Sequence, residues 1–205
     1  MQSSQGLRCR DLGSDRKIGS YWEDRFIEMA VEQYGCTAEG KQKGKSLSAV
    51  AMSPNGGLIL PDTQVSKQGT TIVPEVKHKD PTRHGQYGDE EYRLDDLVEY
   101  STTTGLQVIL AIHDHSLAGG KHVTQNHVCH WRWQDVLVLN EKCDHRAPGF
   151  TWCGGKKVTR FLRYWNVDRF LPLRRHPFFE VAKNPFLRRD ASRPSSQRTL
   201  FSEIM

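Results

Sequence analysis

The chain has 205 residues, of which 37% are hydrophobic and 9% aromatic, and this composition indicates a globular protein rather than a disordered one. Five irregularly spaced cysteines argue against the disulfide framework of a small secreted protein. No apolar stretch approaches a membrane span, and the first ten residues lack the apolar core of a signal peptide, so we expect an intracellular protein without a membrane partner.

Positive charge is concentrated in the last third of the chain. The formal net charge is +5, yet residues 156–189 alone contain ten Lys or Arg and only two acids, Asp168 and Glu180. Such an excess is typical of a protein that binds a polyanion, and it also occurs on solubilising surfaces. Nucleic acid is therefore the partner that the charge distribution suggests.

The first half of the chain predicts a helix followed by strands. Residues 1–18 are polar and aperiodic, so we expect a flexible N-terminus. Apolar side chains then recur on one stripe, which predicts a helix from Ser20, its candidate N-cap, to Gly35. Three strands are predicted at residues 46–54, 58–65 and 70–78. A hairpin-like turn at residues 66–69 joins the last two of them.

The second half repeats this pattern after a predicted loop at 79–88. A helix is expected over 89–104, with Asp89 as candidate N-cap and Gly105 at its end. The continuous apolar run at 106–114 predicts a strand buried on both faces, and residues 131–140 are expected to form another. The order indicates helices packed on a central mixed sheet, an α/β or α+β layered fold.

We expect a single domain over residues 19–189, with a basic C-terminal extension from about residue 141. Residues 190–205 are rich in Ser and Arg and are expected to be a disordered tail. The structure of residues 156–176 is left open by the sequence. If the first part is helical, Arg160 and Arg163 lie on one side, where they could contact phosphates.

Two acids and a lysine stand out near the middle of the predicted strands. Asp62 lies on one strand, and Glu75 follows thirteen positions later on the next, two residues before Lys77. Strand alternation places Glu75 and Lys77 on one face and Val76 on the other, and the turn brings Asp62 near them. Two carboxylates suit Mg²⁺, and a lysine beside them stabilises charge on a phosphate. Pro74 removes one hydrogen-bond donor from this strand.

The segment LPDTQVSKQGTTIVPEVK, residues 60–77, resembles the signature of the PD-(D/E)xK nucleases, the restriction-endonuclease-like superfamily. Pro61-Asp62 correspond to the PD, and Glu75-Val76-Lys77 to the ExK. The core of that family is a helix, a three-strand meander, a helix and a further strand (αβββαβ), an order that residues 20–113 can follow. The resemblance implies cleavage of DNA, or less often RNA, with Mg²⁺ or Mn²⁺ as cofactor.

The resemblance also implies roles for individual residues. Asp62 and Glu75 would hold the metal, Val76 would lend its backbone carbonyl, and Lys77 would position or activate water. Glu23 occupies the first helix, where many members of the family carry a glutamate that assists the metal site. The same residue also fits a capping box with Ser20, and the sequence leaves both roles open.

Four cations are candidate contacts for nucleic acid. Lys79 shares the face of Lys77 and could touch the phosphate backbone, and Arg93 lies on the second predicted helix. Arg160 and Arg163 lie in the basic C-terminal part. For residues on the second helix, ordinary surface pairs are the competing interpretation.

Other assignments compete with a DNA nuclease. A zinc site is suggested by five residues, although they lack a close-set ligand pair: Cys129, His130, Cys143, His145 and Cys153. His113, Asp114 and His115 follow a buried strand and suit either a site or a turn. A nucleic-acid-binding module without cleavage and an RNA-directed nuclease are the alternative functions. Cutting two strands commonly needs two active sites, so a homodimer is one expectation. The biological role expected for such a nuclease is restriction, repair, junction cleavage or defence.

Overall fold

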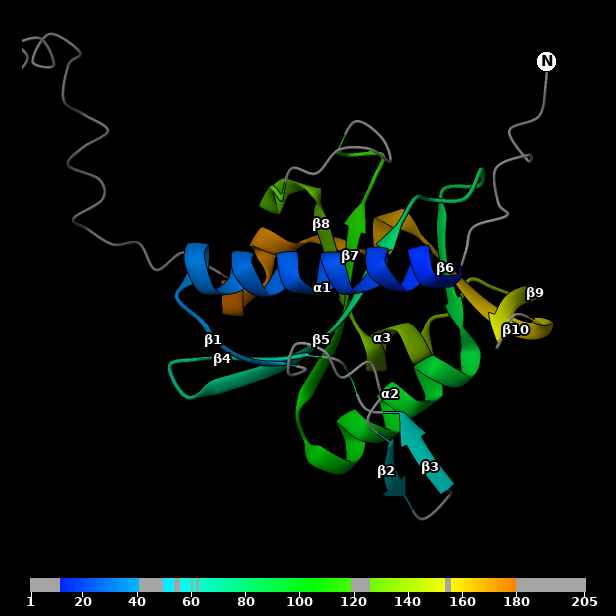
Figure 1. Cartoon of the computed structure of the whole chain (residues 1–205), viewed down its shortest axis with the longest axis horizontal. Helices are drawn as coiled ribbons and strands as arrows, with labels where there is room; N and C mark the ends of the chain where they lie inside the picture. The colour runs from blue at the N-terminus through cyan, green and yellow to red at the C-terminus, as the bar shows by residue number, and fades with distance from the viewer. Residues whose placement is uncertain are drawn as a thin grey trace, which may run out of the picture.

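A six-stranded mixed β-sheet forms the centre of the protein (Figure 1). The computed structural model describes residues 12–40, 50–53, 56–59, 61, 63–118, 126–153 and 156–179. The helices are α1 (Leu12–Tyr34), α2 (Glu91–Thr104) and α3 (Val136–Glu141). The strands of the central sheet, in spatial order, are β1 (Thr37–Gly40), β4 (Thr63–Lys67), β5 (Thr70–Lys79), β7 (Gln107–Asp114), β8 (Trp131–Asp135) and β11 (Leu171–Pro172).

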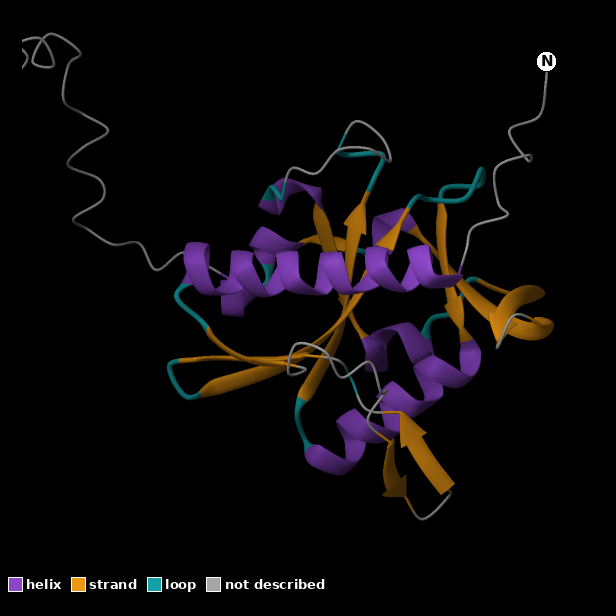
Figure 2. Cartoon of the chain, in the orientation of Figure 1, coloured by secondary structure: helices purple, strands orange, loops and turns teal. Residues whose placement is uncertain are grey.

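Two smaller sheets flank this centre (Figure 2). One contains β6 (Gln86–Glu90), β10 (Lys156–Asn166) and β9 (His145–Cys153), and the other pairs β2 (Val50–Ser53) with β3 (Gly56–Ile59). Short 3₁₀ turns complete the described chain: Val128–His130, Val167–Arg169, Leu173–Arg175 and Pro177–Phe179. None of the helices in these described segments is long and apolar enough to cross a bilayer.

The central sheet has the connectivity that the sequence predicts. β1, β4 and β5 form an antiparallel meander, and α2 then carries the chain to β7, which pairs with β5 in parallel. With α1 in front, the order is αβββαβ, so the predicted α/β fold class is confirmed and is consistent with a restriction-endonuclease-like core. A parallel pair requires such a crossover because its strands must begin at the same edge.

Helices cover both faces of the sheet, and strand alternation divides the core between them. On one side, which we call the α1 face, Ile72 and Val76 of β5 pack with Phe26 of α1. On the other, the α2 face, Val73 of the same strand packs with Leu97 of α2. A sheet buried on both faces explains why the centre of β7, residues 108–112, reads as a continuous apolar run.

The hairpin turn predicted over residues 66–69 is confirmed between β4 and β5, and its loop contains two residues. Gln68 and Gly69 have φ values of 51° and 80°, and Lys67 pairs with Thr70 across the turn. Positive φ at both central residues matches the right-handed twist of the strands, and Gly69 adopts it without steric cost. This turn fixes the register that places the next residues of β5.

Several predicted boundaries are wrong. The first helix begins at Leu12 rather than Ser20, so Ser20 is not its N-cap and the flexible segment expected through residue 18 does not include residues 12–18. Its end is confirmed, because Gly35 has a left-handed φ of 65° and its N–H bonds to the Val31 carbonyl at 3.1 Å, as in an αL cap. The expectations for residues 1–11 and 190–205 lie outside the described residues.

Strand predictions also need correction. Residues 46–54 contain β2, which lies outside the central sheet, and the first strand of the meander is β1, which the sequence did not predict. The predicted strand 58–65 falls into β3 and β4, which belong to different sheets. Residues 86–90 form β6 instead of a loop, and residues 136–141 form α3 instead of continuing a strand.

Candidate active site

β5 carries Glu75 and Lys77 on the α2 face, as strand alternation predicts. Val76 between them packs on the α1 face. The Lys77 ammonium lies 2.7 Å from Glu75 Oε1. The Glu75 side chain is only 1% exposed, whereas Lys77 is 24% exposed, so the acid is buried and the lysine reaches the surface.

Arg93 of α2 completes the surroundings of Glu75. Its Nε donates to Oε1 at 3.2 Å and its Nη2 donates to Oε2 at 2.9 Å, which is a bidentate pair. Arg93 is itself 8% exposed. The parallel crossover explains the contact, because α2 packs directly over β5 on this face. The predicted contact between Arg93 and a phosphate stays a prediction, and Glu75 competes with the phosphate for the Arg93 guanidinium.

Lys79 and Asp89 extend this group of charges. Lys79 Nζ donates to Asp89 Oδ1 at 3.0 Å and also to the Gly88 carbonyl of β6. Asp89 was expected to cap the second helix, but it lies in β6 and the N-cap of α2 is Glu90. We refer to Glu75, Lys77, Lys79, Asp89 and Arg93 together as the β5–α2 charge cluster.

The cluster fixes the charge of Lys77. Burial alone lowers the pKa of Lys77, but the neighbouring carboxylates of Asp89 and Glu75 outweigh it, so the pKa is raised above that of an ordinary lysine. Lys77 therefore carries a proton at neutral pH. In this arrangement it supplies positive charge rather than acting as a general base.

Asp89 makes the cluster sensitive to acid. Burial raises its pKa, but Lys77 and Lys79 outweigh this and hold the pKa at about 2, below the ordinary 3.8. A depressed carboxylate pKa stabilises the fold above pH 3.8, and this contribution is lost as the pH falls towards 2. The shift corresponds to about 2 kcal/mol of unfolding free energy.

We therefore expect Asp89→Asn to lower the unfolding free energy at pH 6 by about 2 kcal/mol. The difference from the wild type should shrink as the pH falls from about 4 towards 2, because the wild type then loses the same interaction. Urea denaturation of both proteins across this range measures it. A difference that stays constant with pH would show that Asp89 contributes through packing and not through its charge.

The described residues meet only part of what a magnesium site needs. Asp62 lies outside them, and within them there is no group of three His, Cys, Asp or Glu side chains that could hold a metal ion. Glu75 accepts two hydrogen bonds on Oε1 and one on Oε2, and a carboxylate has about four acceptor positions. One position on Oε2 therefore remains, which suits a single metal–oxygen bond. Mg²⁺ commonly takes one or two carboxylates and completes its shell with water and phosphate.

Val76 lies on the α1 face of the sheet, and Glu23 lies on α1 itself. Glu23 lies on α1, one residue after Trp22, which stacks on His113 at 3.7 Å between ring centres. The sheet therefore lies between the body of α1 and the β5–α2 charge cluster. With the helix beginning at Leu12, the capping-box interpretation of Glu23 is wrong, while its metal-assisting role stays a prediction.

Arg160 and Arg163 lie on strand β10, so the helical arrangement considered for them is wrong. Three apart on a strand, they point to opposite faces. Arg163 pairs with Glu91 and Asp95 of α2, each at 3.0 Å. The Arg160 guanidinium lies 5.0 Å from the centre of the Tyr92 ring. Of the two, Arg160 is the more exposed.

The histidines at the ends of β5 and β7, His78 and His113, lie on the α1 face with Trp22 and do not join Glu75. His113 is fully buried against Trp22, and burial, followed by the charges of His115 and His130, lowers its pKa to about 3. Asp114 accepts hydrogen bonds from Tyr87 at 2.5 Å and from the Ser116 amide at 2.9 Å. These contacts give Asp114 a structural role.

The Cys and His residues considered for zinc form no cluster where the structure describes their side chains. Cys129 and Cys143 are exposed free thiols. The side chain of Cys153 lies outside the described part, so zinc binding that involves it stays untested.

Sequence reasoning missed the partners that complete the cluster. Arg93 was proposed as a phosphate contact and Asp89 as a helix cap, yet both face β5. No local pattern signals this, because the contacts depend on how α2 and β6 cross the strand. Strand alternation along β5 predicts only that Glu75, Lys77 and Lys79 share one face, and not which residues of α2 and β6 contact them.

The similarity of the chain to known proteins is weak. No family model matches the chain, and no curated protein matches it. Among solved structures, the chain is similar to Hjc, a Holliday junction resolvase from the hyperthermophilic archaeon Archaeoglobus fulgidus. The identity is 15%, the match covers 74% of this chain and 91% of that chain, and the TM-score is 0.44.

Proposed function

We propose that the chain is a metal-dependent endonuclease that hydrolyses phosphodiester bonds in DNA inside the cell. The observation that carries the proposal is the placement of Glu75 and Lys77, 2.7 Å apart on one face of β5, within an αβββαβ core. This is the position that the PD-(D/E)xK resemblance gives to the acid and the lysine of the ExK element.

The second acid of the proposal is Asp62, which the PD-(D/E)xK resemblance assigns to the PD element. Its position lies outside the described residues. We propose that the Asp62 and Glu75 carboxylates share a Mg²⁺ or Mn²⁺ ion, with the Val76 carbonyl as a candidate additional ligand. When bound, such an ion activates water and neutralises charge on the scissile phosphate.

Lys77 and Arg93 have separate roles in this proposal. Lys77 is protonated and partly exposed, so it can stabilise the negative charge that develops on the phosphate. Arg93 is buried, so it acts through Glu75 by holding both carboxylate oxygens in place. Lys79 lies further along the same face and is suited to the neighbouring phosphate.

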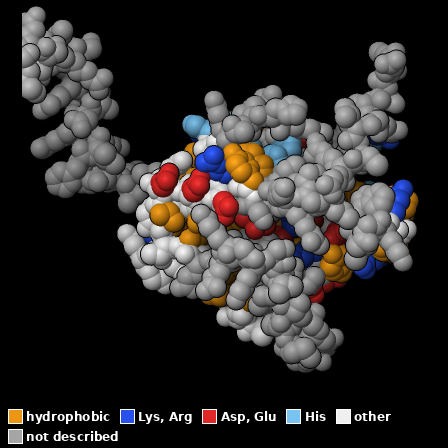
Figure 3. All heavy atoms as spheres, in the orientation of Figure 1, with side chains coloured by type: hydrophobic (Ala, Val, Ile, Leu, Met, Phe, Trp, Pro, Cys, Tyr) orange, Lys and Arg blue, Asp and Glu red, His pale blue; other side chains and the backbone are white. Residues whose placement is uncertain are grey.

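A basic ribbon gives the DNA a place to bind. β9 and β10 form an antiparallel hairpin that projects from the body of the protein (Figure 1), and residues 145–166 contain five Lys or Arg and no acid. We call this segment the β9–β10 ribbon. By contrast, the outer side of α1 carries the exposed acids Asp24, Glu28 and Glu32 (Figure 3). A polyanion is therefore favoured at the ribbon and disfavoured along α1.

One face of the ribbon combines aromatic rings with cations. Phe150 and Phe161 are 65% and 50% exposed, and the pairing of Thr159 with Phe150 places both rings on the same face. Lys157 Nζ lies 3.8 Å from the centre of the Phe150 ring, and Arg146 Cζ lies 4.4 Å from that of Phe161. Bases stack on exposed aromatic rings, and cations beside them contact phosphates.

We expect the double variant Phe150→Ala/Phe161→Ala to bind single-stranded DNA at least about tenfold more weakly, since each stacked base contributes about 1–3 kcal/mol. Fluorescence anisotropy with a labelled oligonucleotide measures this. Leu137→Ala, which removes a 40% exposed side chain from α3, is the control and should leave affinity unchanged. An altered oligomeric state with unchanged DNA affinity would instead identify the ribbon as an interface between copies.

The activity itself is tested with supercoiled plasmid DNA and, in parallel, with RNA. We expect nicking of the plasmid with Mg²⁺ or Mn²⁺ and none with a chelator. Binding without cleavage under every metal condition would favour the alternative, a nuclease-like module that binds nucleic acid without cutting it. Cleavage of RNA alone would make the chain an RNA-directed nuclease. Linearisation in one binding event would support a homodimer with two active sites.

A further inference from the structure

The exposed rings of the β9–β10 ribbon lie on the face that leads to the β5–α2 charge cluster. Asp89 of β6 pairs directly with Arg163 of β10, and Arg163 pairs with Arg146 of β9. Directly paired residues of an antiparallel sheet point to the same face. Phe161 lies two positions from Arg163 on β10 and therefore shares this face. Because Asp89 contacts Lys79 at 3.0 Å, one continuous face connects the cluster with the rings.

The distance along this face is short. A strand rises about 3.4 Å per residue, so Phe161 lies about 7 Å from Arg163 along β10. Thr159, the partner of Phe150, lies about 14 Å from Arg163. One strand of a DNA duplex advances about 3.4 Å per nucleotide, so both rings lie within about two to four duplex steps of the cluster.

The two rings are spaced for an unpaired base. Phe161 pairs with Pro148, two positions before Phe150 on β9, so the two phenylalanines are diagonal neighbours. Diagonal neighbours on one face lie about 7–8 Å apart, which is about twice the 3.4 Å repeat of stacked bases. A single base fits between side chains at this spacing, with a ring on either side. Such a base must first leave the stack of its own strand.

Cations stand at the outer ends of the ring pair. Lys157 lies beyond Phe150 towards the end of the ribbon, with its Nζ 3.8 Å from the centre of that ring. Arg146 lies beyond Phe161 towards the base of the ribbon, with its Cζ 4.4 Å from the ring centre. The order along the face is therefore cation, ring, ring, cation. This order matches a stacked base with a phosphate on either side.

The opposite face of the ribbon is closely packed. A Cβ at Gly149 would overlap Leu162, and a Cβ at Gly88 would overlap Tyr164, so this packing requires glycine at both positions. It holds β6, β9 and β10 together, and the rings on the other face are therefore presented at a fixed spacing. Groups that are already fixed lose less freedom when a ligand binds.

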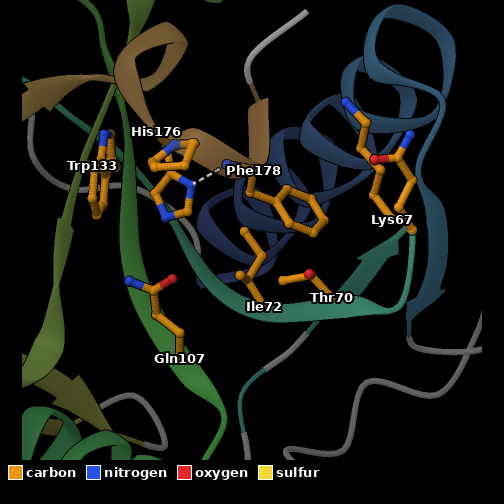
Figure 4. Close-up of a pocket in the computed structure, with 9 residues that line it drawn as sticks. Lys67, Thr70, Ile72, Gln107, Trp133, His176 and Phe178 are labelled. Carbon is orange, nitrogen blue, oxygen red and sulfur yellow. Dashed lines mark hydrogen bonds between the residues drawn. The ribbon is translucent and has the colours of Figure 1, made fainter. Parts of the chain in front are cut away.

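A pocket of about 580 Å³ beside the β4–β5 hairpin is a less suitable place for this base (Figure 4). Its walls include Ile72, Trp133 and Phe178, which belong to the core on the α1 face. Lys77 lies on the α2 face, so the sheet separates the pocket from Lys77. A base beside a phosphate bound at Lys77 therefore has the ribbon, and not this pocket, within reach.

We propose that the substrate is DNA in which the cut strand is unpaired beside the scissile phosphate, with one base held between Phe150 and Phe161. This preference rests on the proposed nuclease function and adds the form of DNA on which it acts, namely a bubble, a gap or a single-stranded tail. In continuous duplex the bases stay stacked on one another, so the duplex meets the ribbon only through its phosphates.

Fluorescence anisotropy with two labelled duplexes of equal length tests the preference in the presence of a chelator. One duplex is fully paired, and the other carries a central bubble of mismatches. We expect the bubble to bind at least about tenfold more tightly, and Phe150→Ala/Phe161→Ala to reduce this ratio to less than about threefold. Phe150→Tyr/Phe161→Tyr, which keeps both rings, and Leu137→Ala should retain the full ratio. Equal affinity of the wild type for the two duplexes would overturn the proposal.

Cleavage of the same duplexes with Mg²⁺ or Mn²⁺ locates the cut. We expect cuts inside the bubble or within about four nucleotides of its edge, the distance in duplex steps between the cluster and the rings. Cuts spread evenly along the paired arms would overturn the preference and leave the proposed nuclease function intact. No cleavage of either duplex, with tighter binding of the bubble retained, would instead refute the proposed activity and support the ribbon as a site for unpaired bases.

Discussion

Replacing Lys77 with methionine should reduce Mg²⁺-dependent nicking of plasmid DNA about 100- to 1,000-fold, the range found when one group that stabilises transition-state charge is removed. Methionine keeps much of the apolar stem and removes the ammonium that lies 2.7 Å from Glu75. Glu75 stays paired with Arg93 in this variant, so the acid keeps its position. The initial rate of nicking at saturating DNA is the measurement.

Lys79→Met is a matched control for this experiment. Lys79 lies two residues along the same strand and face, pairs with an acid, and is 25% exposed against 24% for Lys77. We expect its loss to change nicking by less than about tenfold, since it contacts Asp89 and not Glu75. Equal losses in the two variants would mean that the lysines act through general attraction for DNA and that Lys77 has no special place in the reaction.

Arg93→Met should cause the largest loss of stability among variants of the β5–α2 charge cluster. Glu75 is 1% exposed, and removal of its bidentate partner leaves a buried carboxylate with Lys77 alone. Breaking a buried ion pair costs about 3–5 kcal/mol of unfolding free energy, and we expect about 3 kcal/mol because Lys77 remains. Urea denaturation at pH 7 provides the measurement.

Arg163→Met provides the comparison for Arg93→Met. Arg163 pairs with Glu91, which keeps Arg146 as a second partner, and with Asp95, which is 55% exposed. Its loss should therefore cost about 1 kcal/mol or less. Adding Glu75→Gln to Arg93→Met should recover part of the stability, because the unpaired buried charge is removed. The account is contradicted if both arginine variants lose the same free energy and Glu75→Gln restores none.

The sequence predicts the placement of Glu75 and Lys77 because strand periodicity is a local property. Glu75, Val76 and Lys77 alternate between faces as any strand must, and the turn is signalled by Gly69, which adopts positive φ without steric cost. The two-sided burial of β7 is likewise visible as an unbroken apolar run. These features depend on neighbours within a few positions.

The remaining features depend on contacts distant in sequence. Arg93 meets Glu75 only because α2 packs back over β5, and Asp89 meets Lys79 only because β6 passes beside it. Residues 131–140 read as one strand because Trp131, Trp133 and the apolar run 136–139 dominate the segment. However, Asp135 accepts the Leu137 N–H at 2.9 Å and starts α3. An aspartate before an apolar run is a helix-start signal that hydrophobicity alone conceals.

A crystal structure of the protein soaked with Mn²⁺ tests the central claim most directly, because Mn²⁺ scatters anomalously and can replace Mg²⁺ at carboxylate sites. We predict an anomalous peak within about 2.0–2.2 Å of a Glu75 carboxylate oxygen, with an Asp62 oxygen as the second ligand and Lys77 beside the ion. A protein that nicks DNA in solution but shows no peak at Glu75, with its carboxylate still held by Arg93 and Lys77, would contradict the proposed metal site.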